Sequence, residues 1–210
     1  MNLINCDNYH KIRLGKKNDG GYVIYDGLDY DLIIGCGISN DISFEDYFVE
    51  KYKCKSIVYD GTIKKLPKSK YDHKWFNQNV YEGTLDNLLN DNINIFLKID
   101  IEGCEWDLFK NINLENVSQM VIEFHSGFKY PDINMEILKK IEESHYLHHI
   151  HGNNYRKKQY KIDNKIIHSV FEASYINKKL CKHVEPIKYS YHILDQSNNP
   201  KKEDIKNMCL

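Results

Sequence analysis

The sequence predicts an α/β domain built on a mostly parallel β-sheet with helices on both faces. Short apolar runs alternate along the chain with amphipathic segments, and several of these runs end in a glycine or an acidic residue. Such alternation is typical of parallel strands joined by right-handed helical crossovers. Ligands of these sheets bind outside the carboxyl ends of the strands, so we expect the residues at those ends to converge on one site.

The expected elements follow one another from the first strand onward. That strand, 30–34, is an apolar run that ends in Gly35, Cys36 and Gly37. In 42–52, aromatic side chains recur at spacings of three and four, which predicts a helix. The remaining expected strands are 56–59, 75–80, 93–99, 119–124, 146–151 and 169–175, and the remaining expected helices are 85–89 with Thr84 as its N-cap, 105–110 and 135–144.

The chain is expected to form a single domain over residues 1–194, because no internal repeat and no Pro/Gly/Ser-rich linker divides it. Residues 18–21, Asn-Asp-Gly-Gly, are a turn signal within 11–26, which predicts a hairpin lying against the domain. Residues 195–210 are polar and are expected to form a C-terminal tail that frays.

Composition and charge narrow the class of function. The formal net charge is −1, so the basic excess of a duplex-binding protein is absent and we expect no nucleic-acid partner. The apolar runs are shorter than a membrane span, so we expect no membrane partner, and the oligomeric state stays open. The six cysteines have no C-x-x-C spacing and no signal peptide precedes them, which predicts a cytoplasmic location. That would be the host cytoplasm if the abundance of Asn, Lys and Ile reflects an AT-rich viral genome.

Two features predict a nucleoside-containing cofactor. Gly35 and Gly37 follow the first strand, where glycine lets the backbone turn tightly and approach a ligand. The third glycine of the dinucleotide fingerprint would stand at position 40, but the chain has Asn40 there. Asp60 ends the second strand, and its carboxylate can accept two hydrogen bonds from a ribose diol. These residues suit a nicotinamide cofactor or S-adenosylmethionine, and an ordinary turn with a solvated aspartate remains an alternative.

The strand 93–99 leads into a cluster of acids: Asp100, Glu102 and Glu105. Clustered carboxylates repel one another and lose solvation where they are buried, so such a cluster is typical of sites that handle a cation, a metal or a proton. The sulfonium and ammonium of S-adenosylmethionine are such cations, and we expect Asp100 and Glu102 to bind them. A solvated first helical turn, stabilised by the helix dipole, remains an alternative for Glu102 and Glu105.

Glu123 and His125 end the next strand, and they lie beside Asp100 if the two strands are neighbours. Asp100, Glu123 and His125 are then candidate ligands of a divalent cation such as Mg²⁺ or Mn²⁺. Asp100 and His125 are also the candidate catalytic bases. A histidine that only fixes a loop by hydrogen bonding remains an alternative for His125.

A histidine-rich stretch, 145–151, is followed by Gly-Asn-Asn. Its spacing matches no standard metal site, although His-rich tracts can bind metal. We interpret His151, Asn153 and Asn154, together with Glu123, as a polar rim over the substrate pocket.

These motifs resemble those of a known family. Residues 98–105, Lys-Ile-Asp-Ile-Glu-Gly-Cys-Glu, resemble the K-[IV]-D-[IV]-E-G-x-E signature of the FkbM family of S-adenosylmethionine-dependent methyltransferases. Residues 13–23 resemble the R-[IL]-G-x-x-x-D-G-G-Y-V stretch of a methyltransferase-like subgroup. Residues 37–45 resemble its cofactor loop, and 149–154 with 172–175 resemble its C-terminal strands. The resemblance covers residues 11 to about 178, most of the chain.

The resemblance implies a Rossmann-like class I methyltransferase: a seven-stranded sheet with helices on both faces and the last strand antiparallel. It implies that Gly35, Gly37 and Asp60 hold S-adenosylmethionine, with Asp100 close to its methionine moiety. No acid directly precedes Gly35, so contacts to the methionine ammonium are expected from Asp41, Glu45 or Asp19. Family members mostly methylate oxygens, often on sugars or natural products, which implies a small hydroxyl substrate, a sugar or glycan first.

Three other functions stay open. A nicotinamide-dependent oxidoreductase or epimerase would use the same kind of sheet, but it usually carries a Tyr-x-x-x-Lys pair, and neither Tyr155 nor Tyr160 has a lysine four residues later. A methyltransferase acting on a nucleotide or an RNA cap fits the same motifs. A binding module that kept the fold is expected to lose the acids at the strand ends, and they are present here.

Overall fold

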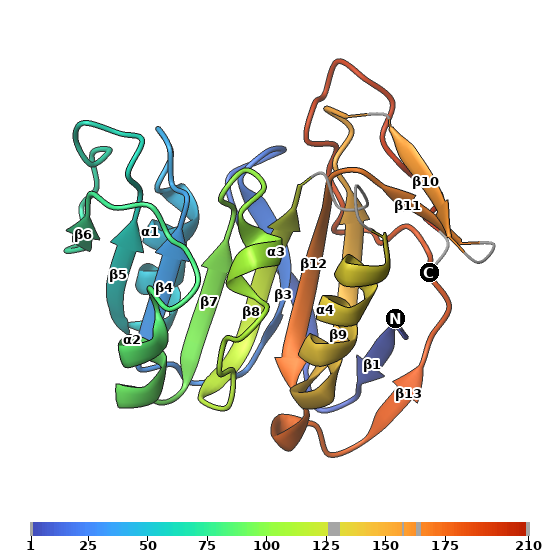
Figure 1. The fold of residues 1–210 in the computed structure, drawn as a ribbon, viewed down its shortest axis with the longest axis horizontal. Helices are drawn as coiled ribbons and strands as arrows, with labels where there is room; N and C mark the ends of the chain where they lie inside the picture. The colour runs from blue at the N-terminus through green and yellow to red at the C-terminus, as the bar shows by residue number, and fades with distance from the viewer. Residues whose placement is uncertain (1, 126–130, 157, 163–164, 209–210) are drawn as a thin grey trace.

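The computed structural model describes residues 2–125, 131–156, 158–162 and 165–208. The strands of the central sheet are β4 (Leu32–Cys36), β5 (Lys55–Tyr59), β6 (Lys74–Phe76), β7 (Ile95–Ile99), β8 (Val117–Phe124), β9 (His145–Gly152) and β12 (Phe171–Asn177). Their order across the sheet is β6-β5-β4-β7-β8-β12-β9 (Figure 1). Strand β12 is antiparallel to both of its neighbours, and the other pairs are parallel. The predicted fold class, including the antiparallel last strand, is confirmed.

Helices cover both faces of the sheet. They are α1 (Ser43–Tyr52), α2 (Asp86–Asp91), α3 (Glu105–Leu108) and α4 (Pro131–Ser144). Strand β7 shows how they are divided, because successive side chains of a strand point to opposite faces. Phe96 packs against Phe44 and Phe48 of α1, whereas Leu97 belongs to the larger core cluster that also holds apolar residues of α2, α3 and α4. Within the described residues, no helix is long and apolar enough to cross a membrane.

An N-terminal hairpin lies on the α1 face of the sheet. Strands β2 (His10–Gly15) and β3 (Gly21–Asp26) pair antiparallel around the turn signal at 18–21. The buried side chain of Gln119 in β8 attaches the hairpin: its Oε1 accepts a bond from the Tyr25 N–H at 2.7 Å, and its Nε2 donates to the Tyr25 carbonyl at 3.0 Å. One amide thus replaces a neighbouring strand and holds β3 at Tyr25, near the amino end of β8. At the other end of β3, the Tyr22 hydroxyl donates to Asp100, which follows β7.

Some local expectations are wrong. Leu85, not Thr84, occupies the N-cap of α2, and the Thr84 hydroxyl instead accepts a bond from the Tyr81 N–H. The expected strand 75–80 is reduced to β6. A hairpin of β10 (Gln159–Ile162) and β11 (Lys165–His168), the pair of β1 (Ile4–Cys6) with β13 (Val184–Pro186), and the short 3-10 helix η1 (Lys178–Leu180) were not expected.

The C-terminal segment 195–208 packs on the sheet instead of fraying. The carboxylate of Asp195 lies 2.8 Å from His149 Nε2, and the Asn198 amide donates to Glu172 at 2.6 Å. Asp204 and Glu172 flank the buried His151; burial lowers its pKa, but the two hydrogen-bonded carboxylates outweigh burial and raise it to about 10. The segment is polar because it binds the buried polar groups of β9 and β12.

Candidate active site

Three adjoining hollows lie where the carboxyl ends of the parallel strands meet. We name them by their linings. The glycine-side hollow (about 270 Å³) includes Gly37, Ser39, Asp60, Asn79, Asp100 and Glu102. The acidic hollow (about 410 Å³) includes Asp19, Asp100, Glu102, Glu123, His125 and Asn153. The outer hollow (about 480 Å³) includes Glu102, His125, Tyr155, Arg156, Lys158 and Tyr160. Asp100 and Glu102 join the first two hollows, and Glu102 and His125 join the last two.

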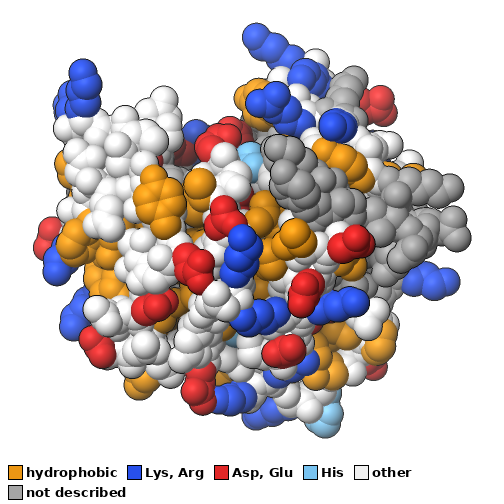
Figure 2. Space-filling model, viewed as in Figure 1, with side chains coloured by type: hydrophobic (Ala, Val, Ile, Leu, Met, Phe, Trp, Pro, Cys, Tyr) orange, Lys and Arg blue, Asp and Glu red, His pale blue; other side chains and the backbone are white. Residues whose placement is uncertain are grey.

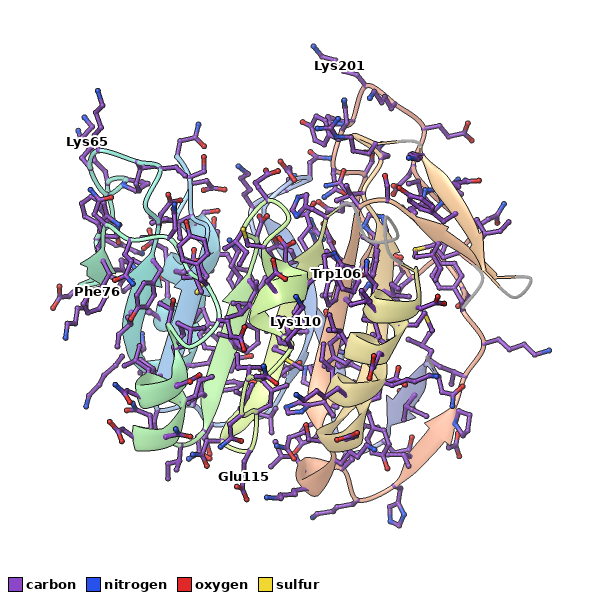
Figure 3. The ribbon with its side chains drawn as sticks, in the orientation of Figure 1. Lys65, Phe76, Trp106, Lys110, Glu115 and Lys201 are labelled. Carbon is purple, nitrogen blue, oxygen red and sulfur yellow. The ribbon has the colours of Figure 1, made fainter. Side chains whose placement is uncertain are left out.

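The pictures place these hollows at one edge of the sheet. Figure 2 shows a depression at the top of the molecule, with acidic and histidine side chains at its base and a raised wall on each side. In Figure 3, Lys65 and Lys201 mark these two walls, and Glu115 marks the opposite end of the sheet.

The loop after β4 passes very close to the loop after β7. Gly37 has a φ of 77°, and a Cβ at this position would lie 1.6 Å from the carbonyl oxygen of Asp100. A Cβ at Gly35 would lie 2.6 Å from Oε1 of the buried Glu45 in α1. Both glycines therefore admit close approach of protein groups. Of the two, Gly37 lines the glycine-side hollow.

Asp60 is fixed in the wall of the glycine-side hollow. Its Oδ2 accepts a bond from the Ser39 N–H at 2.7 Å, and its Oδ1 accepts bonds from the N–H and hydroxyl of Thr62 at 2.7 and 2.6 Å. Burial raises the pKa of Asp60, but these hydrogen bonds outweigh burial and lower it. An ionised carboxylate in a set orientation can still accept bonds from a diol.

Asp41 has a different place from the one expected. It stands just before α1, where its Oδ1 accepts a bond from the Ser43 N–H and its Oδ2 pairs with Lys16 at 2.6 Å. Asp41 is not one of the described residues that line the three hollows. Its carboxylate instead links the turn of the hairpin to α1.

Asp100, Glu102, Glu123 and His125 come together, as their positions at neighbouring strand ends predicted. His125 Nε2 lies 3.9 Å from Asp100 Oδ1, 3.6 Å from Glu102 Oε2 and 3.8 Å from Glu123 Oε1. The other ring nitrogen of His125, Nδ1, lies 2.9 Å from the buried carboxylate of Glu105. Glu105 therefore orients the imidazole so that Nε2 points at the other three acids.

The protonation of this cluster follows from its charges. Burial lowers the pKa of His125, but the hydrogen bond to Glu105 and the charges of Glu105, Glu123 and Asp100 outweigh burial and raise it to about 9. Burial raises the pKa of Asp100, against the opposing charges of Lys98 and His125. At neutral pH the imidazole is thus protonated in the unliganded protein. Asp100 is the better placed of the two candidate bases to accept a proton.

Three groups of the cluster fit a small hard cation. Asp100, Glu102 and His125 each offer one ligand atom, and these atoms all lie within 4.8 Å of one another. Glu102, with φ 55° and a side chain 85% exposed, stands in this set where the sequence suggested Glu123. The two carboxylates suit Mg²⁺ or Mn²⁺, and the imidazole can become a third ligand after it loses its proton. Glu123 instead accepts a bond from the Asn153 amide at 2.5 Å.

The expected polar rim divides into two parts. Glu123 and Asn153 line the acidic hollow. His151 and Asn154 are buried and bind the C-terminal segment: the Asn154 amide donates to the Ser197 hydroxyl at 2.6 Å, and His151 lies 3.2 Å from Asp204. Their contacts make them supports of the wall.

Sequence reasoning assigned no role to Lys98, which lies beneath the site. Its Nζ donates to the Gly37 carbonyl at 2.6 Å and lies 3.9 Å from Asp100 Oδ2, which also accepts a bond from the Tyr22 hydroxyl at 3.3 Å. Burial lowers the pKa of Lys98, but the charges of Asp100 and Glu45 outweigh burial and raise it. A lysine inside an otherwise apolar strand was the available signal, because such a charge is buried only when it is paired.

Comparison with known proteins agrees with this geometry. Residues 17–157 match a family model described as the methyltransferase FkbM domain. The matched region contains all four strand ends that carry Gly37, Asp60, Asp100 and His125. No curated protein matches the chain.

Proposed function

The chain belongs to the FkbM family of methyltransferases, and on this basis we propose that it uses S-adenosylmethionine to methylate a hydroxyl oxygen of a small molecule. A sugar or glycan is the first candidate substrate, by analogy with the family. The observation that carries the proposal is the junction of two hollows at Asp100 and Glu102. Methyl transfer between two bound molecules needs two binding sites that meet where the methyl group passes from one to the other, and two hollows that share residues suit this requirement.

The residues of the glycine-side hollow suit S-adenosylmethionine. The carboxylate of Asp60 is oriented to accept hydrogen bonds from the ribose diol, and the side-chain amide of Asn79 can bind the adenine ring. Asp100 and Glu102 at the other end offer negative charge to the ammonium and sulfonium. Of the other acids considered for the ammonium, Asp19 lines the acidic hollow, whereas Asp41 binds Lys16 and Glu45 is buried beneath Gly35.

The chain supplies a base and its supports for the acceptor. When bound, S-adenosylmethionine supplies a methyl group whose bond to sulfur breaks as a bond to the acceptor oxygen forms. Asp100 takes the proton of that hydroxyl, while Tyr22 and Lys98 hold its carboxylate in place. Glu123 and Asn153 bind the acceptor in the acidic hollow, and His125 contributes positive charge beside them. The family membership favours this function over a nicotinamide-dependent oxidoreductase.

A binding comparison and a transfer assay test the cofactor and the reaction. We expect calorimetry to detect binding of S-adenosylhomocysteine and no binding of NAD. We expect labelled methyl transfer to an acceptor within a panel of sugars, glycans and nucleotide sugars. Binding of NAD alone would contradict the proposal, and transfer only to capped RNA would move the substrate to the nucleotide class.

We also propose that Asp100, Glu102 and His125 hold Mg²⁺ or Mn²⁺; the ion would displace the proton of the imidazole and supply the positive charge in its place. A divalent cation held there would lower the pKa of an acceptor hydroxyl and so would ease transfer of its proton to Asp100. EDTA is expected to reduce turnover about tenfold or more, and added Mn²⁺ to restore it. Glu102→Gln should require more metal for the same rate, whereas Asp107→Asn, on the exposed side of α3, should not. Turnover that is insensitive to EDTA would refute the metal.

A further inference from the structure

The charge of the site changes sign along its length. Of the residues that line the acidic hollow and not the outer one, three are acids, Asp19, Asp100 and Glu123. Of the residues that line the outer hollow and not the acidic one, Lys158 is a cation and none is an acid within the described chain. Arg156 stands between them and lines both. An elongated substrate is therefore oriented by charge, with a cationic or neutral end inward and an anionic end outward.

Two cationic side chains, those of Arg156 and Lys158, line the outer hollow. In the part of the chain that the structure describes, no carboxylate lies within ion-pair distance of Arg156 or Lys158. Both side chains are exposed, and Lys158 Nζ lies 5.0 Å over the ring of Tyr160. Lys202 of the C-terminal segment adds a third cation nearby, where it donates to the Tyr155 carbonyl at 3.1 Å. Figure 2 shows Lys and Arg side chains gathered on this wall of the depression.

Guanidinium and ammonium groups beside aromatic rings suit a phosphate attached to a ring. Arginine binds a phosphate through two parallel hydrogen bonds, and lysine binds it as a point charge. Tyr155 and Tyr160 line the outer hollow, with Lys202 Nζ 5.9 Å from the ring centre of Tyr155 and Lys158 Nζ 5.0 Å from that of Tyr160. The exposed ring of Tyr155 can also stack on a sugar or a base. A carboxylate-rich inner end repels the same phosphate, so the phosphate does not compete for the place of the reacting hydroxyl.

Resting on the proposed methyl transfer, we propose that the acceptor is a phosphorylated hydroxyl compound, either a sugar phosphate or a nucleoside-diphosphate sugar. Its phosphate binds Arg156 and Lys158 in the outer hollow, while its hydroxyl lies in the acidic hollow near Asp100. A small molecule is favoured over a nucleic acid because the net charge of the chain is −1, without the basic excess typical of a nucleic-acid-binding protein.

The test measures binding apart from turnover. Calorimetry with inorganic pyrophosphate, glucose 1-phosphate, UDP-glucose and free glucose, each with S-adenosylhomocysteine present, is expected to detect the phosphates and not glucose. The double variant Arg156→Ala/Lys158→Ala should weaken phosphate binding about tenfold or more. The single variant Arg156→Lys should have an intermediate effect, because it keeps the positive charge but loses the two parallel N–H donors of the guanidinium group. Comparison of glucose 1-phosphate with UDP-glucose distinguishes the two sources of phosphate.

Controls separate this inference from the proposed function. Lys179→Ala removes an exposed cation paired with Glu115 at the opposite end of the sheet and should leave phosphate binding unchanged. The affinity for S-adenosylhomocysteine should be the same in all these variants. Equal phosphate binding by wild type and double variant, or binding only to capped RNA, would overturn the inference. Phosphate binding that depends on Arg156 without any binding of S-adenosylhomocysteine would refute the cofactor proposal alone.

Discussion

Replacement of Asp100 by alanine is expected to lower the rate of methyl transfer by about 10²–10⁴-fold. Asp100 lines both the glycine-side and acidic hollows, and its carboxylate is held by the Tyr22 hydroxyl at 3.3 Å and flanked by Lys98 and His125. Alanine removes the proposed base and the negative charge at the point where donor and acceptor meet. Initial rates of labelled methyl transfer at saturating substrate measure the change in kcat.

Two further variants are compared with Asp100→Ala to show why its rate changes. Asp100→Asn keeps the size of the side chain but cannot accept the proton, so its kcat should fall nearly as far as that of the alanine variant. Asp107→Ala removes an exposed acid of α3, 68% exposed, and should leave the rate unchanged. Activity of Asp100→Ala within about threefold of wild type would remove Asp100 from the chemistry. Unchanged kcat with weakened S-adenosylhomocysteine binding would limit Asp100 to holding the cofactor.

Replacement of Lys98 by methionine is expected to lower the free energy of unfolding by about 3–5 kcal/mol. Lys98 is buried, and its ammonium supports three groups: the Gly37 carbonyl, Asp100 and the buried Glu45. Methionine fills much of the same volume but leaves a buried carboxyl without its cation and a carbonyl without its donor. Urea unfolding of the protein without ligands measures the loss.

A double-mutant cycle isolates the charge effect of Lys98. Burial raises the pKa of Glu45, so Glu45→Gln removes a group that depends on the lysine, and Lys98→Met/Glu45→Gln should recover part of the lost stability. Lys110→Met, at an exposed pair with Asp107, should change stability by less than about 0.5 kcal/mol. Lys98→Met with a loss below about 1 kcal/mol would show that the lysine is not a support of the site.

The positions of the main site residues were predictable because of a general property of parallel sheets. Strand ends recur at one edge whatever the details of packing, so Gly37, Asp60, Asp100 and His125 could be placed together from the sequence. Lys98 could have been noticed as a charge within a buried strand. The sequence did not indicate Glu45 as the partner of Lys98, because Glu45 lies in α1, and α1 comes close to Lys98 of β7 only when the sheet has folded.

The polar residues near the C-terminus show the limit of the sequence. Asn154, His151 and the segment 195–208 have the composition of a solvated rim and tail. Their hydrogen bonds join residues more than 40 positions apart, such as Asn154 with Ser197 and His149 with Asp195. Composition reports whether a side chain is polar, but the partner that satisfies it is set by tertiary contacts.

The amino-acid sequence alone therefore predicts an α/β sheet and the strand ends of the candidate site, because hydrophobic period and strand polarity are local properties. The FkbM type is implied by the resemblance of its motifs. Folding brings Lys98 under Asp100, assigns Glu102 rather than Glu123 to the candidate metal set, and builds the outer hollow from Arg156 and Lys158. These outcomes depend on distances between segments remote in the chain. Side-chain packing sets those distances, and the order of the residues does not reveal them.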